Sequence, residues 1–281
     1  MRSLHNVLAP AKLNLFLHIT GRRDDGYHLL QSVFMLIDWC DTLHFDVRDD
    51  GLIEREDLNV ALPADDLVMR AAQSLQRASG TTLGAHIAIE KHIPAQAGMG
   101  GGSSDAATTL LALNRLWGLH WPLSKLIPLG LALGADVPFF LGGHNAWVEG
   151  IGEKMTPIEL PTARFAVVKP NAGLETVKIF RAPELKRSTE TATMPIFAVN
   201  PYGFGRNDLQ PVAQALCPEI TEALEWLGSF GFSPRMTGSG SAVFAKLPDG
   251  VLIDSAPHNW QMRICSNMAV HPQAGWAASE S

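Results

Sequence analysis

A glycine-rich stretch places the tightest constraint on how this chain can fold. It reads Pro94-Ala-Gln-Ala-Gly-Met-Gly-Gly-Gly-Ser-Ser-Asp105, with four glycines in the five residues that begin at Gly98. Glycine lets a backbone take positive φ values and come close to a ligand. Serine and aspartate, which follow, are preferred residues at the start of a helix. The stretch therefore predicts a glycine loop that leads into a helix capped by Ser-Ser-Asp.

The flanking residues support this prediction. Ile87 and Ile89 alternate in a strand pattern before the loop, whereas Leu110, Leu113 and Trp117 recur at helical spacing after it. A strand, a glycine loop and a helix N-terminus form an anion site, because free N–H groups and the helix dipole favour negative charge. The natural ligand is a polyphosphate.

Other phosphate loops fit this stretch less well. A Walker A loop needs Lys-Ser/Thr after its last glycine, but Ser103 and Ser104 follow Gly102 and the next lysine is Lys125. A dinucleotide loop has fewer adjacent glycines, and a protein kinase would carry His-Arg-Asp and Asp-Phe-Gly, which are absent. When the loop is considered by itself, the alternative is a glycine-rich turn that precedes a well-capped helix and binds no ligand.

Composition narrows the class of protein. The 281 residues are 46% hydrophobic and 18% charged with a net charge of −6, which suits a globular chain and argues against a nucleic-acid or membrane partner. The cysteines, Cys40, Cys217 and Cys265, lie far apart in no metal-binding spacing and predict reduced thiols in a cytoplasmic protein.

Two further positions carry chemistry. Lys12 and Asn14 fall on the same face of a predicted strand, about 7 Å apart, although such a pair is usually a solvated face. Asp136 lies in Gly134-Ala-Asp-Val-Pro138 beside an apolar run, and a carboxylate there needs a partner. The alternative is a turn aspartate bonded to its own backbone.

The remaining periodicity predicts elements in both halves of the chain, and a boundary between residues 158 and 159. The segment after Pro272 is expected to be frayed. Cys40-Asp41 is expected to join two short strands. The predicted strands are Lys12–Thr20, Ser32–Trp39, Thr42–Val47, Arg164–Lys169 and Ala242–Lys246, and the predicted helices are Asp66–Ala78, Ser124–Leu133 and Pro218–Phe230.

Pro94–Ser104 resembles the ATP-binding motif of the GHMP kinases. Pro10–His28 resembles the N-terminal signature of the branch that phosphorylates a cytidine diphosphate-linked methylerythritol, and Met236–Ala245 resembles the third, C-terminal glycine motif of the family. Together with Gly134–Pro138, these motifs make the match specific. The resemblance implies a two-lobed α+β fold with the site in the cleft between the lobes. An N-terminal ribosomal-protein-S5-like ATP-binding lobe would span residues 1–158, and a C-terminal ferredoxin-like lobe residues 159–281.

The same resemblance implies ATP and Mg²⁺ as cofactors and a monomer or weak homodimer. Lys12 and Asp136 would be the catalytic pair, with Asp136 taking or orienting the proton of the acceptor hydroxyl. The sequence identifies no Mg²⁺ ligands, although Ser103 and Ser104 offer hydroxyls. The implied ATP-binding residues are Lys91, Pro94, Ala95, Gln96, Ala97, Gly98, Met99, Gly100, Gly101, Gly102, Ser103 and Ser104.

The implied acceptor site recognises a small molecule through its cytosine. Tyr27 and Phe180 would stack on the base and His28 would bond its edge, although Phe180 is also a good core residue and Lys91 an ordinary strand-end lysine. The remaining acceptor-binding residues would be Asn14, Thr176, Gly238 and Ser239.

Two positions depart from the pattern of the relatives. Ala95-Gln-Ala97 has less glycine than theirs, and Asp66 stands where they often carry an asparagine that contacts adenine.

Two rival functions stay open. The first is another GHMP kinase, of homoserine or mevalonate type, against which the Gly26-Tyr-His28 turn argues. The second is a nucleotide-binding module without activity, against which the presence of both Lys12 and Asp136 argues.

Overall fold

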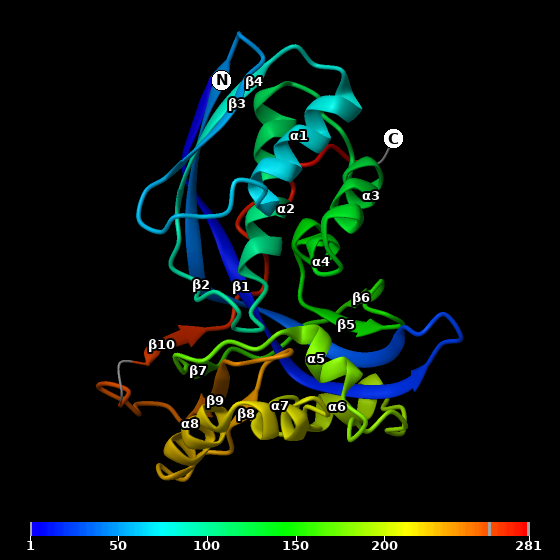
Figure 1. The fold of residues 1–281 in the computed structure, drawn as a ribbon, viewed down its shortest axis with the longest axis vertical. Helices are drawn as coiled ribbons and strands as arrows, with labels where there is room; N and C mark the ends of the chain where they lie inside the picture. Colours follow the sequence, from blue (N-terminus) through cyan, green and yellow to red (C-terminus); the bar gives the residue numbers. More distant parts are fainter. Residues whose placement is uncertain (1, 258–259, 280–281) are drawn as a thin grey trace.

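The computed structural model describes residues 2–257 and 260–279, whose strands form two sheets (Figure 1). The first has the order β3-β4-β2-β5-β6, with β1 paired to β2, and the second has the order β10-β7-β9-β8. The first contains β1 (Ser3–Arg22), β2 (His28–Arg48), β3 (Ile53–Asp57), β4 (Gly84–Glu90), β5 (Ala146–Glu149) and β6 (Lys154–Pro157). The second contains β7 (Arg164–Lys169), β8 (Arg235–Met236), β9 (Val243–Leu247) and β10 (Gln261–Ser266).

The helices form two groups in chain order. Figure 1 shows α1 to α4 beside the first sheet and α7 and α8 beside the second. Helices α5 and α6 also contact the first sheet, through Phe180 against His28 and Phe197 against Phe16. The first group contains α1 (Leu67–Ser79), α2 (Gly101–Leu116), α3 (Leu123–Leu133) and α4 (Val137–Gly142). The second contains α5 (Thr176–Arg181), α6 (Met194–Val199), α7 (Gln210–Leu216) and α8 (Pro218–Gly228). In the described residues, no helix is long and apolar enough to cross a membrane.

A shared aromatic core joins the two parts. The ring of Phe16 in β1 lies 5.4 Å from that of Trp147 in β5 and 5.9 Å from that of Phe197 in α6, centroid to centroid. This cluster also buries residues of β7 and β9, including Phe165 and Phe244. The two sheets are therefore held together by apolar burial, which stabilises their relative position.

The prediction of two strands joined at Cys40-Asp41 is wrong, because β2 runs without a break from His28 to Arg48. The pairing of β1 with β2 shifts register between Pro10 and Ala11, as it does at a β-bulge. Pairing continues on both sides of this shift. Asp41 resembles a turn residue in the sequence but is fully buried within the strand.

The expectation of a frayed tail is also wrong for residues 273–279, whereas residues 280–281 lie outside the described part. The chain after β10 returns to the first sheet and its helices. The amide of Met268 donates to Leu36 O over 2.9 Å, that of His271 to Gly143 O over 2.8 Å, and that of Ala278 to Trp121 O over 3.2 Å. Backbone pairing and the burial of His271 and Gln273 order a segment whose polar composition suggests none. A boundary between residues 158 and 159 stays a prediction.

Candidate active site

The glycine loop leads into α2 as predicted, but the predicted cap is wrong. The helix begins at Gly101, and Gly100 before it has a φ of 72° and no side-chain capping bond. Because glycine reverses the chain at this point, Ser103, Ser104 and Asp105 already lie inside the first turns. The first N–H groups of α2 have no partner within the helix and are available to an anion.

A cleft of about 530 Å³ lies over this loop. Of the predicted ATP-binding residues, all line it except Ser104, which is fully buried beneath it. Asp66, which departs from the pattern of the relatives, also lines the cleft and accepts a hydrogen bond from the amide of Met69 as the N-cap of α1.

The loop is held by the second glycine motif. The amide of Ser241 donates to Gln96 O over 3.1 Å, and that of Ala242 donates to Ala97 O over 3.2 Å. A Cβ at Gly98 would lie 2.3 Å from Thr237 O, so only glycine permits this approach. Two motifs that lie more than a hundred residues apart in the sequence thus form one wall of the site.

Lys91 is partly buried in an ion cluster and is not an ordinary strand-end lysine. Its Nζ contacts the carboxylates of Asp41 and Asp105, the latter at 2.5 Å. Burial lowers the pKa of Lys91, but the attraction of Asp105 and Asp41 outweighs it and raises that pKa overall. Burial and the nearby Asp41 raise the pKa of Asp105. Because its charge is already paired, Lys91 offers the cleft chiefly its aliphatic stem.

The cluster fixes both ends of the glycine loop. Asp41 accepts hydrogen bonds from the amides of His92 and Ile93, at 2.5 and 2.7 Å, where the chain enters the loop. Asp105 lies on α2, where the chain leaves it. Asp41 and the ionic role of Asp105 are not predicted from the sequence, because no local spacing signals a contact between residues so far apart in the chain.

The predicted catalytic pair comes together below the loop. Lys12 Nζ lies 3.6 Å from Asp136 Oδ2 and donates to Asn14 Oδ1 over 2.5 Å. The Nδ2 of Asn14 donates to Ser32 Oγ over 2.9 Å. Lys12 is only 4% exposed and therefore does not belong to a solvated strand face. Asp136 precedes α4 without a side-chain capping bond, so the turn alternative has no support.

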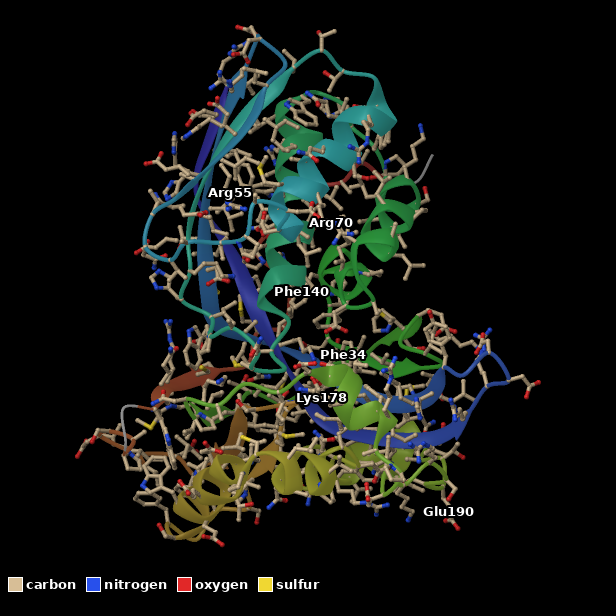
Figure 2. All side chains as sticks on the ribbon, viewed as in Figure 1. Phe34, Arg55, Arg70, Phe140, Lys178 and Glu190 are labelled. Atoms are coloured by element: carbon tan, nitrogen blue, oxygen red, sulfur yellow. The ribbon has the colours of Figure 1, made fainter. Side chains whose placement is uncertain are left out.

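An aromatic ring lies against Lys12. Its Nζ is 4.9 Å from the centroid of the Phe34 ring, a cation–π contact. In Figure 2, Phe140, Phe34 and Lys178 of α5 follow one another through the region where the two parts of the molecule meet. The catalytic pair lies in the same region, because Lys12 and Phe34 are in contact.

A second cleft, of about 290 Å³, contains Lys12, Asn14 and Asp136. It adjoins the first, because residues of one wall line both clefts. Across their boundary, Thr176 Oγ1 and Ser239 Oγ are hydrogen-bonded at 2.8 Å. The shared wall residues are Gly98, Gly100, Thr176 and Ser239, and Gly238 lines the second cleft. Asn207, which no motif in the sequence singles out, holds this wall by donating to Met236 O and Gly238 O.

A third cleft, of about 440 Å³, brings Tyr27, His28 and Phe180 together. Its walls include Leu30, Ile151 and Phe180, which also line the second cleft. Tyr27 is 61% exposed, and the rings of His28 and Phe180 lie 5.1 Å apart at an angle of 40°. Flat side chains that face an open cleft suit an aromatic ligand.

Comparisons with known proteins agree with this geometry. Residues 66–144 match the GHMP kinases N terminal domain and residues 196–260 match the GHMP kinases C terminal domain. The chain is 69% identical to the 4-diphosphocytidyl-2-C-methyl-D-erythritol kinase of Albidiferax ferrireducens, over 100% of this chain and 98% of that one. This chain belongs to the GHMP kinase family. It is also 62% identical to the kinase of the same name from Variovorax paradoxus, over 99% and 100% of the two chains.

Solved structures confirm the predicted GHMP kinase fold. A crystal structure of 4-(cytidine 5'-diphospho)-2C-methyl-D-erythritol kinase is 35% identical, with a TM-score of 0.74 over 86% of this chain and 90% of that one. A homoserine kinase from Cytophaga hutchinsonii, at 15% identity, matches with a TM-score of 0.67 over 96% of each chain, which shows the fold alone. As a member of this family the chain is a kinase and uses ATP.

Proposed function

We propose that this GHMP kinase transfers the γ-phosphoryl group of ATP to the 2-hydroxyl of 4-diphosphocytidyl-2-C-methyl-D-erythritol, a step of the non-mevalonate isoprenoid precursor pathway. The names of its relatives support this acceptor. The observation that carries the proposal is the adjacency of the three clefts, with Lys12 and Asp136 in the one that shares walls with both others. A donor in the first cleft and an acceptor in the third would meet at this pair.

Phosphoryl transfer asks the protein mainly for positioning and charge stabilisation. The N–H groups of the glycine loop and α2 would bind the ATP phosphates. Asp136 would orient the acceptor hydroxyl and receive its proton, while Lys12, 3.6 Å away, offsets the charge that develops on the transferred group.

Mg²⁺ would neutralise the phosphate oxygens of ATP. Within residues 2–257 and 260–279, no group of three or more histidine, cysteine, aspartate or glutamate side chains is placed to hold a metal. That agrees with magnesium chemistry, since this ion keeps several waters and binds through substrate phosphates with one or two protein oxygens. Ser103 Oγ in the first cleft and the Asp136 carboxylate in the second are the candidate oxygens.

The acceptor would lie across the second and third clefts. Tyr27 and Phe180 would stack on the cytosine and His28 would bond its edge, while Asn14 holds the acceptor end near Lys12. Thr176, Gly238 and Ser239 would line the passage between base and hydroxyl. We further propose that the chain acts in the cytoplasm as a monomer or weak homodimer. We also propose that it has no nucleic-acid partner, which the net charge of −6 supports.

The test is ADP release from Mg-ATP with each of four acceptors: the cytidyl-diphospho-methylerythritol, mevalonate, homoserine and galactose. We expect turnover with the first acceptor alone. Turnover with one of the others would retain the fold and the Lys12–Asp136 pair but reject the cytosine pocket. ATP binding without turnover on any acceptor would favour a non-catalytic nucleotide-binding module.

A further inference from the structure

Arg187 forms a network between the segment after α5 and the first strand pair. Its Nε donates to His28 Nε2 over 3.1 Å. Its two terminal nitrogens bind four backbone carbonyls around it, which fixes the guanidinium in one plane and one orientation. These carbonyls belong to Phe180, Ala182, Pro183 and Leu185, at distances from 2.6 to 3.4 Å.

This contact determines where His28 carries its proton. A guanidinium has only donors and does not lose its charge in proteins. The ring nitrogen that it faces must therefore accept, so Nε2 is unprotonated and the single proton of a neutral ring resides on Nδ1. Burial lowers the pKa of His28, and the positive charges of Arg187 and Arg22 lower it further, which agrees with a neutral ring.

The other ring nitrogen is left for a ligand. In the part of the chain that the structure describes, Nδ1 of His28 makes no hydrogen bond. His28 lines the third cleft together with Tyr27 and Phe180. Nδ1–H is therefore the hydrogen-bond donor that the neutral His28 ring can offer to a ligand in this cleft.

We propose that Arg187 is a positioning residue that holds His28 as an Nδ1–H donor and so makes the base cleft select cytosine over uracil. This inference rests on the proposed function. Cytosine presents an unprotonated N3, which accepts from Nδ1–H, whereas uracil presents an N3–H, which opposes it. Without Arg187 the ring can carry its proton on Nε2, so that Nδ1 becomes an acceptor and fits uracil as well.

The first test measures the tautomer directly and needs no acceptor. Long-range ¹H–¹⁵N correlation spectra of the ¹⁵N-histidine-labelled protein identify the protonated ring nitrogen, with His28 assigned by its absence in His28→Gln. We expect a neutral ring with the proton on Nδ1. An Nε2–H tautomer or an imidazolium at neutral pH would overturn the proposal, whatever the outcome of the acceptor panel.

The second test compares kcat/KM for the cytidine- and uridine-diphosphate-linked acceptors in the wild type, in Arg187→Met and in Arg181→Met. Arg181 is a matched control, because it lies on α5 and lines a hollow together with His28 and Arg187, whereas among the described residues no hydrogen bond joins it to His28. We expect Arg187→Met to reduce the preference for the cytidine acceptor about tenfold. A change of this size is the effect of losing one hydrogen bond that distinguishes the two bases. Arg181→Met should leave this preference unchanged, and the KM for ATP should be unchanged in both variants.

An unchanged preference in a folded Arg187→Met, with the same melting temperature, would overturn the proposal. If this variant does not fold, the tautomer of the wild-type protein still decides the question. Failure of the wild type to use either acceptor would reject the proposed function and leave the tautomer result standing.

Discussion

At the scale of single residues, Lys12 shows how much of the site local spacing reveals. Alternation places Lys12 and Asn14 on one strand face, and the structure joins them by a 2.5 Å hydrogen bond. Strand spacing does not show whether this face is buried, because the alternating pattern is the same for a solvated face and for a covered one. Asp136 lies more than a hundred residues further along the chain, and only the resemblance of its motif to the family predicted that it would join Lys12.

Gly100→Ala should reduce ATP affinity about tenfold. Gly100 has a φ of 72°, where an alanine is strained by about 1–2 kcal/mol. Its Cβ would also lie 3.0 Å from the Phe140 ring and 3.3 Å from Lys12 Cγ. The measurement is calorimetric titration with a non-hydrolysable ATP analogue. Gly228→Ala in α8, where a Cβ meets nothing within 4 Å, is the control; equal affinities for both variants would contradict this account of the loop.

Tyr27→Ala should raise the acceptor KM about tenfold, since stacking on one base contributes about 1–3 kcal/mol. The KM for ATP should stay the same, because Tyr27 lines the third cleft and not the first. Steady-state kinetics with each substrate varied in turn measure both constants. Phe230→Ala removes another exposed aromatic ring and should change neither; an equal rise of both constants in Tyr27→Ala would remove Tyr27 from the acceptor site.

At the scale of elements, the order strand, glycine loop, helix could be predicted, but the boundaries of the elements could not. The predicted cap at Ser-Ser-Asp is wrong because Gly100 itself starts the helix through a left-handed turn. The cluster of Asp41, Lys91 and Asp105 was beyond prediction, since it depends on the register between β2 and β4, which pairs Thr42 with Glu90. Register of this kind is set by the packing of the whole sheet.

Lys91→Met should destabilise the fold by about 3–5 kcal/mol, because it leaves two buried carboxylates without their cation. Asp105→Asn should cost clearly less, since it leaves one carboxylate for one ammonium and removes the group whose pKa burial already raises. Urea unfolding of both variants measures the difference. Equal losses in the two variants would show that the cluster does not hold the loop through charge balance.

At the scale of the whole molecule, a family resemblance carried by four motifs predicted the fold, which neither composition nor periodicity could assemble. The path of residues 267–278 could not be predicted, because their contacts are backbone bonds to distant strands and loops. This segment reaches the site indirectly. The ring of His271 lies 6.3 Å from that of Phe140, whose edge in turn packs against Gly100.

Protonation of His271 should weaken this packing at acid pH. Burial lowers its pKa from 6.5 to about 4. The unfolded chain therefore binds the proton first as the pH falls, and stability is lost between about pH 6.5 and pH 4 by about 3 kcal/mol. Urea unfolding at several pH values measures this loss. In His271→Gln the extra acid sensitivity should disappear, and an identical pH dependence in both proteins would contradict the assignment.

In the proposed reaction, Asp136 is the group that orients the acceptor hydroxyl and receives its proton. The most direct measurement is a paired assay of Asp136→Asn: calorimetric ATP binding and single-turnover phosphoryl transfer to the cytidyl-diphospho-methylerythritol. We predict ATP binding within about twofold of the wild type, because Asp136 lines the second cleft and not the first, and transfer slowed at least about 100-fold. Transfer at the wild-type rate would contradict the assigned role and, with it, the placement of the reaction at the Lys12–Asp136 pair.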